Sequence, residues 1–135
     1  MTTGYSGTPL VNKLGIKPGQ RIKLVHAPPE YFDWIDTPLS DQLCKQNEVP
    51  GLVHLFVKNN KEYVAEMKKL ERIIKKNTSV IIWVSWYKKS AGIVTDLTED
   101  VIRQYALQNG LVDVKVCAIN DTWSGLKLVV PLKKR

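Results

Sequence analysis

The fold is decided by residues 79–132, SVIIWVSWYKKSAGIVTDLTEDVIRQYALQNGLVDVKVCAINDTWSGLKLVVPL. Its continuous apolar run, 80–86, predicts a strand that is covered on both faces, because a half-exposed strand would alternate polar and apolar residues. After a basic loop, a helix begins at one of two rival N-caps, Asp96 or Thr98. The helix ends at 109–110, Asn-Gly, the pair that best accepts a left-handed backbone.

The same segment closes with a hairpin. Two strands, 112–119 and 125–132, are predicted on either side of the turn-forming linker 120–124, in which Asp and Ser most often bond their own backbone. We expect Cys117 to be buried in the first of these strands. The hairpin adds an antiparallel strand to the sheet.

The preceding part of the chain adds two strands and a long helix. A short helix ends at Leu14 and a tight turn leads to a first strand, 21–27. The run 52–57 predicts a central strand, and 61–76 is the clearest helix, with an apolar stripe opposite a basic face. Residues 30–51 give a weak signal, at most one helix interrupted by a proline.

Strands that alternate with helices favour a parallel sheet with both faces covered. We therefore predict a single α/β domain over residues 1–135. It has three layers and a mixed, Rossmann-like sheet of about five strands, with a C-terminal antiparallel hairpin.

The composition is that of a soluble globular protein, with 44% hydrophobic and 24% charged residues. We see neither a membrane span nor a leader sequence, so we expect a cytoplasmic protein. The two cysteines, Cys44 and Cys117, are far apart and follow no metal-binding spacing. We expect both to be reduced and predict no metal site.

The net charge of +7 is local. The helix 61–76 contributes +3 and the tail 133–135 contributes another +3. Such local basicity supports nucleic-acid binding only weakly, and no recognition motif for nucleic acid accompanies it.

The phrase GIKPGQ at 15–20, and the run 80–86 after a long helix, resemble class I methyltransferase-like Rossmann domains. The resemblance implies that the final hairpin inserts an antiparallel strand beside its neighbour. In that family a glycine-rich turn after the first strand approaches the cofactor, but here 26–30, His-Ala-Pro-Pro-Glu, replaces it. Since Pro28 and Pro29 lack the N–H groups of a cradle, the resemblance implies a truncated relative with no evident cofactor.

A second resemblance covers nearly the whole chain. The phrases at 6–10, 85–90 and 95–100 (SGTPL, SWYKKS and TDLTED) are similar to a small uncharacterised bacterial family, a domain of unknown function. It implies no activity.

In open α/β sheets, ligands bind beyond the carboxyl ends of the parallel strands. The loop after 80–86 is the richest of these, because it places aromatics beside two cations and a hydroxyl. We predict an anion-binding loop formed by Trp86, Lys88, Lys89 and Ser90. The alternative is that Trp86 caps the core and the lysines are merely solvated.

Other polar residues fall near the same edge. His26 ends the first strand, where it is a candidate acid, base or ligand, although a structural histidine is the commoner case. Thr95 and Asp96 are candidates for the cleft that holds Lys88, with Asp96 as a helix cap being the alternative. We expect His54, inside a buried strand, to be a hydrogen-bonded core residue. No triad is recognisable, and we assign no catalytic residue.

These observations favour a non-catalytic binding or interaction module for a protein partner or a small anionic ligand. The first alternative is a reduced S-adenosylmethionine- or nucleotide-binding enzyme with His26 or Asp96 as acid or base. The second is weak nucleic-acid binding through 61–76 and the tail, and a membrane role is not expected.

Overall fold

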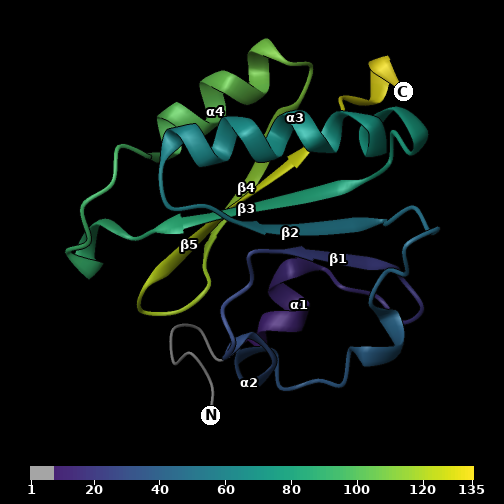
Figure 1. Ribbon diagram of the computed structural model, residues 1–135, viewed down its shortest axis with the longest axis horizontal. Coiled ribbons are helices and arrows are strands. Elements are labelled where there is room, and N and C mark those ends of the chain that lie inside the picture. Colours follow the sequence, from purple (N-terminus) through teal and green to yellow (C-terminus); the bar gives the residue numbers. More distant parts are fainter. Residues whose placement is uncertain (1–7) are drawn as a thin grey trace.

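The computed structural model describes residues 8–135 and contains one five-stranded mixed sheet with helices on both faces (Figure 1). The strand order is β1-β2-β3-β5-β4. The strands are β1 (Ile22–Val25), β2 (Leu52–Phe56), β3 (Ile81–Tyr87), β4 (Val112–Ala118) and β5 (Trp123–Val129). The first three are parallel, and β5 lies antiparallel between β3 and β4. The predicted three-layer α/β fold with its terminal hairpin is confirmed.

Long helices cover one face of the sheet and short helices cover the other (Figure 1). The first face carries α3 (Asn60–Lys76) and α4 (Glu99–Gln108), and the second carries α1 (Leu10–Leu14) and α2 (Tyr31–Ile35). Three single turns of 3-10 helix complete the structure, at Ser40–Gln42, Lys89–Ala91 and Leu132–Lys134. No helix among residues 8–135 is long and apolar enough to cross a membrane.

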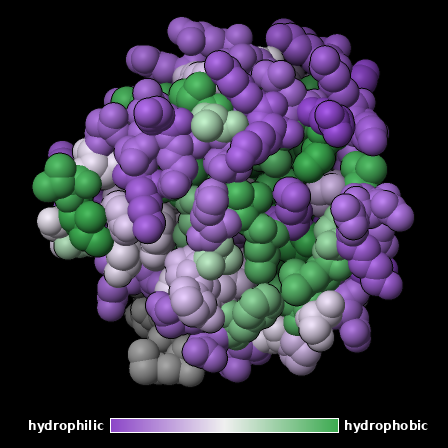
Figure 2. Space-filling model, in the orientation of Figure 1, coloured by the Kyte–Doolittle hydropathy of each residue, from purple (hydrophilic) through white to green (hydrophobic). Residues whose placement is uncertain are grey.

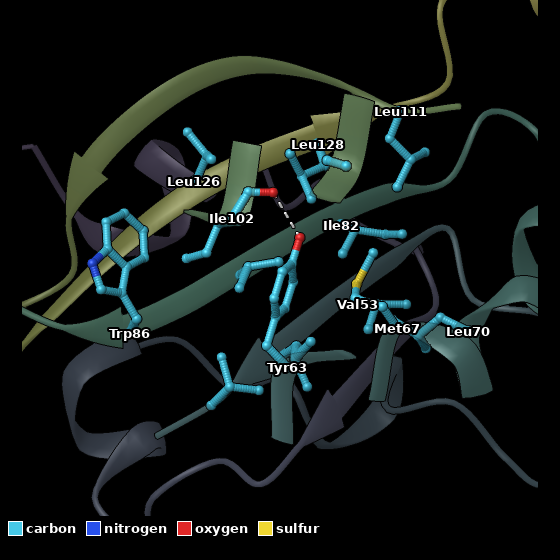
Figure 3. Close-up of a cluster of buried hydrophobic side chains, with 14 of the residues drawn as sticks. Val53, Tyr63, Met67, Leu70, Ile82, Trp86, Ile102, Leu111, Leu126 and Leu128 are labelled. Atoms are coloured by element: carbon cyan, nitrogen blue, oxygen red, sulfur yellow. Dashed lines mark hydrogen bonds between the residues drawn. The ribbon is translucent and has the colours of Figure 1, made fainter. Parts of the chain in front are cut away.

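The core beneath α3 and α4 is mostly aliphatic and surrounds Tyr63 (Figure 3). Tyr63 of α3 is fully buried, and its hydroxyl donates to the Ile102 carbonyl of α4 at 2.9 Å. Alternate residues of the central strands meet these helices, because successive side chains of a strand point to opposite faces. They include Val53, Leu55, Ile82, Val84, Leu126 and Leu128.

The core on the other face, which we call the aromatic core, holds four large buried rings among aliphatic side chains. Trp83 is fully buried, and its indole N–H donates to the Leu14 carbonyl at the end of α1, at 2.9 Å. Phe56 packs edge-on against Trp123, with ring centroids 5.0 Å apart. These large rings provide the contact area that two five-residue helices cannot provide alone.

Side-chain caps set where the long helices start. The Asn59 side chain accepts a hydrogen bond from the Glu62 N–H at 2.8 Å, so α3 begins at Asn60. Of the two rival caps for α4 it is Thr98 that is used, because its hydroxyl accepts from the Val101 N–H at 3.2 Å.

Two strands were predicted with boundaries that differ from the structure by two residues or more. The first strand ends at Val25 rather than at residue 27, because His26 adopts a left-handed backbone with φ 58°. The last strand runs over Trp123–Val129 rather than 125–132. There the side chain of Asn120 accepts from the N–H groups of Thr122 and Trp123, which shortens the turn.

Residues 30–51 contain α2, one turn of 3-10 helix and no strand of the sheet. Cys117 lies in β4 as predicted, but it is half-buried rather than buried, because β4 is an edge strand. Both cysteines are free. Ser6 and Gly7, part of the phrase at 6–10, lie outside the described residues.

The substitution Gly125→Ala should destabilise the protein. Its methyl group would lie 3.0 Å from Ile119 Cδ1 and 3.2 Å from Trp83 Cε3, and the tryptophan ring is fixed in the core. We expect a loss of about 1–3 kcal/mol in the free energy of unfolding, measured by urea denaturation. Gly51→Ala is the control, because it meets chiefly the flexible Gln20 side chain at 3.3 Å. Equal stability of the two variants would contradict this packing argument.

Candidate functional site

The loop that follows β3 is fastened to the start of α3. The Thr95 hydroxyl donates to the Lys58 carbonyl at 2.7 Å, and the Asp96 carboxylate accepts from the Asn60 N–H at 2.8 Å. Asp96 therefore does act at a helix N-terminus, but that helix is α3 rather than α4. Both side chains hold the fold together at this edge of the sheet.

Of the four residues of the predicted anion-binding loop, Trp86 lies in the core and the other three lie at the surface. Trp86 is 7% exposed and packs among the residues beneath α3 and α4, as its alternative role predicted. The backbone N–H of Lys88 donates to the Thr122 carbonyl at 2.8 Å, which ties the loop to the β4–β5 turn. Lys89 and Ser90 lie next to it, exposed on a single 3-10 turn. Lys88, Lys89 and Ser90 thus stay together at the surface without the tryptophan.

His26 faces a different part of the molecule. Its Nε2 lies 2.9 Å from a Glu66 carboxylate oxygen on α3, and that side chain is only 13% exposed. The His26 hydrogen bond lowers the pKa of Glu66, and Lys69 at 3.4 Å lowers it further. Since Asn60 and Glu66 are six residues apart, His26 and Asp96 attach to α3 about 9 Å apart along its axis. The two residues proposed as acid or base therefore do not share a site.

A groove of about 1030 Å³ lies between β1, the loop at 44–50 and α3. Figure 2 shows hydrophobic surface in the middle of this face, bordered by hydrophilic side chains over α3. We call this hollow the basic groove, for its cations. Its lining combines these cations with aliphatic and uncharged polar residues and two carboxylates. The lining residues are Lys23, Leu24, Val25, His26, Cys44, Lys45, Gln46, Asn47, Glu48, Val49, Pro50, Glu66, Lys69, Leu70, Arg72, Ile73 and Lys76.

The charges of the basic groove are unbalanced. Its two carboxylates are already paired, Glu66 with His26 and Lys69, and Glu48 with Arg21 at 3.2 Å. Four of its cations make no ion pair with any residue of 8–135, namely Lys23, Lys45, Arg72 and Lys76. The groove therefore presents uncompensated positive charge beside apolar surface.

Cys44 also lines this groove, but its thiol is engaged. It donates to the Glu48 carbonyl at 3.1 Å, and burial raises its pKa. A thiol of raised pKa is a poor nucleophile. Among residues 8–135, no group of three or more His, Cys, Asp or Glu side chains is placed to hold a metal ion.

The sequence indicated His26 and the basic face of α3 separately, but it did not indicate that they line the same groove. The missing component is the loop at 44–50, which belongs to the segment of weakest signal. A useful indication was available in Lys23 on the first strand, because lysine is a common residue on exposed edge strands.

A serine and a histidine do meet elsewhere, in the interior. His54 Nε2 lies 2.7 Å from the Ser85 hydroxyl, and His54 Nδ1 lies 2.9 Å from the Tyr31 hydroxyl. All three side chains are 0% exposed, and burial lowers the pKa of His54 to about 3. The prediction of a hydrogen-bonded core histidine is confirmed, and no substrate reaches this pair without unfolding the core.

The sequence matches no protein-family model and no curated protein. Several solved structures resemble the fold, among them the following two. One, an uncharacterized protein from Listeria monocytogenes serotype 4b, has a TM-score of 0.58 at 8% identity, covering 93% of this chain and 68% of that one. The other, from Streptococcus agalactiae, is described as a protein in the NADB-Rossmann superfamily. It has a TM-score of 0.52 at 10% identity, covering 91% of this chain and 68% of that one.

The fold is Rossmann-like. At these identities the likeness concerns the architecture, which is the three-layer mixed sheet described above.

Burial of His54 makes stability depend on pH. An unfolded histidine titrates near pH 6.5, whereas folded His54 stays neutral down to about pH 3, so the unfolded state binds the extra proton between these values. The free energy of unfolding should fall as the pH drops through this window, by about 1.4 kcal/mol per pH unit.

Urea denaturation at pH 7, 6 and 5 measures this slope. The variant His54→Asn should be less stable at pH 7 but should lose the slope, because asparagine does not titrate. Parallel curves for the two proteins would show that His54 is not the titrating group.

Proposed function

We propose that this protein is a non-catalytic binding module that takes an anionic partner in the basic groove. The observation that carries the proposal is the set of four groove cations that make no ion pair within residues 8–135, beside two carboxylates that are already paired. An anionic ligand would neutralise this charge in a partly enclosed site, where electrostatic attraction exceeds that on open surface.

The groove has the mixed character of a binding site. Leu70 and Ile73 of α3 and Val25 of β1 supply apolar contact, and lysine and arginine side chains line it as well. Lys88, Lys89 and Ser90 are a second, smaller anion-binding candidate of the same module. We place the module in the cytoplasm, which keeps thiols such as Cys44 and Cys117 reduced.

Two double variants of α3 test the groove. Arg72→Ala with Lys76→Ala removes two charges that line it, whereas Lys68→Ala with Lys75→Ala removes two exposed charges of the same helix that do not. Fluorescence anisotropy with labelled octaglutamate measures the affinity of each. We expect the groove variant to lose about fivefold and the control less than about twofold, since each exposed ion pair is worth a few tenths to 1 kcal/mol.

Equal losses in the two variants would mean that the probe senses only the net charge of α3, and the groove would lose its assignment. The same comparison at two salt concentrations shows whether attraction is electrostatic, because salt screens it.

The second candidate function is a reduced S-adenosylmethionine- or nucleotide-binding enzyme. The observation that favours it is the position of β5, antiparallel between β3 and β4, which resembles the insertion in class I methyltransferase-like domains. The left-handed His26 also gives the chain after β1 a turn of the kind that glycine makes in that family. The likeness to a small uncharacterised bacterial family is part of this proposal and adds no activity.

Thermal unfolding with S-adenosylhomocysteine tests this candidate. A ligand at ~100 times its dissociation constant adds about 2.7 kcal/mol to stability, which raises the melting temperature by several degrees. We expect no shift, because His26 is bonded to Glu66 and Pro28 and Pro29 offer no N–H groups. Lys89→Ala is the control, because it removes a cation of the second anion-binding candidate. A clear rise in melting temperature that this variant leaves unchanged would favour the enzyme over the binding module.

A further inference from the structure

The outer edge of β1 is open over its second half. Among the residues of β1, Ile22 is the one with a partner there within 8–135: its carbonyl accepts from the Cys44 N–H at 2.8 Å, in an isolated parallel bridge with Leu43. Beyond this point the chain turns away, with the Lys45 N–H bonded to the Glu48 carboxylate. The segment 43–44 therefore begins to pair with β1 and then leaves it.

Leu24 carries the unused backbone groups. Backbone groups alternate in direction along a strand, and the Arg21 carbonyl accepts from Leu52 of β2, so residues 21 and 23 face β2 while 22 and 24 face outward. No residue among 8–135 bonds to the N–H or C=O of Leu24. The basic groove runs along this edge, since four consecutive residues, 23–26, line it.

The helix above this edge is also incompletely covered. Ile73 of α3 and Val25 of β1 pack against the core but stay half-buried, and both line the groove. A strand added beside β1 would lie within about 5 Å of it and beneath this part of α3. It would satisfy the Leu24 backbone and cover both side chains.

From these observations we infer that the partner in the basic groove is an acidic protein segment that joins the sheet as an extended strand beside β1. The inference rests on the proposed function and names its partner class. Main-chain hydrogen bonds hold such a segment, and the alternating side chains select its sequence.

The two faces of β1 define that sequence. Lys23 and Val25 pair with Val53 and Leu55 and share their face, toward α3, whereas Leu24 pairs with His54 and faces the aromatic core. On the α3 side an added strand meets the groove cations, so every second residue is acidic. On the other side it continues the apolar surface of Leu24, so the intervening residues are apolar.

A nucleic acid fits these features less well. Single strands bind chiefly by stacking bases on aromatic rings, and the groove lining contains no Phe, Tyr or Trp. A nucleic acid also leaves the open backbone of Leu24 without a complementary strand.

A labelled heptapeptide of alternating valine and glutamate is the probe. Two versions of it are N-methylated at alternate residues, one set on each edge of the extended peptide, so both lose the same number of N–H groups and keep all charges. One set faces β1 and the other faces solvent. We expect one version to bind at least about tenfold more weakly than the parent and the other to bind within about twofold. On the edge that faces β1, methylation removes a buried hydrogen bond and adds a steric clash, whereas on the solvent edge it does neither.

Hydrogen exchange of the Leu24 amide, followed by NMR, is the second measurement on the intact protein. Its exchange should slow at least tenfold when the parent peptide is bound, while the amides of the β4 edge stay unchanged. This readout needs no substitution in the protein, so it does not depend on a variant that folds.

The outcomes separate this inference from the proposed function. Strand addition is overturned if both methylated versions bind like the parent and the exchange of the Leu24 amide is unchanged. If the Arg72→Ala, Lys76→Ala variant still weakens binding in that case, the basic groove binds anions by charge alone. Failure of the heptapeptide and octaglutamate to bind at all overturns both proposals. Tighter binding of an oligouridylate without protection of Leu24 identifies a nucleic-acid site instead and also overturns strand addition.

Discussion

The two central strands are buried on both faces, and the chain has to cover both. All five residues of β2 and five of the seven in β3 are buried. On one face α3 and α4 supply long apolar stripes, whereas within residues 8–135 the opposite face is covered by two α-helices of five residues each. Large aromatic rings make up for the missing helix length.

The short layer is fixed by polar groups as well as by packing. Trp83 donates to the end of α1, and His54 joins Tyr31 of α2 to Ser85 of β3. A buried polar group without a partner costs about 1–3 kcal/mol, so few arrangements of these elements are tolerated. Among residues 8–135, no buried side-chain nitrogen or oxygen lacks a hydrogen bond. Rings alone would pack in several ways, whereas these bonds favour one.

Local signals predicted the elements better than their relations. The apolar runs and the periodicity of 61–76 were sufficient for the fold, because burial on both faces leaves a plain pattern. Asp96 shows the limit. The sequence identifies it as a helix cap, but it accepts its hydrogen bond from the N–H of Asn60 in α3, 36 residues earlier. The basic groove shows the same limit, since it joins β1, 44–50 and α3, whose proximity no local pattern encodes.

The two edges of the sheet are protected from unwanted pairing in different ways, and the difference explains which edge can accept a strand. On β4 the register shifts between Asp113 and Lys115, and such an irregularity bends the strand and disfavours regular pairing with a further strand, although Val116 is half-exposed. On β1 the backbone stays regular and Lys23 stands over it. An apolar strand would bury that charge uncompensated, whereas an acidic strand would neutralise it. The charge that prevents random pairing at β1 therefore also selects the strand that can bind there.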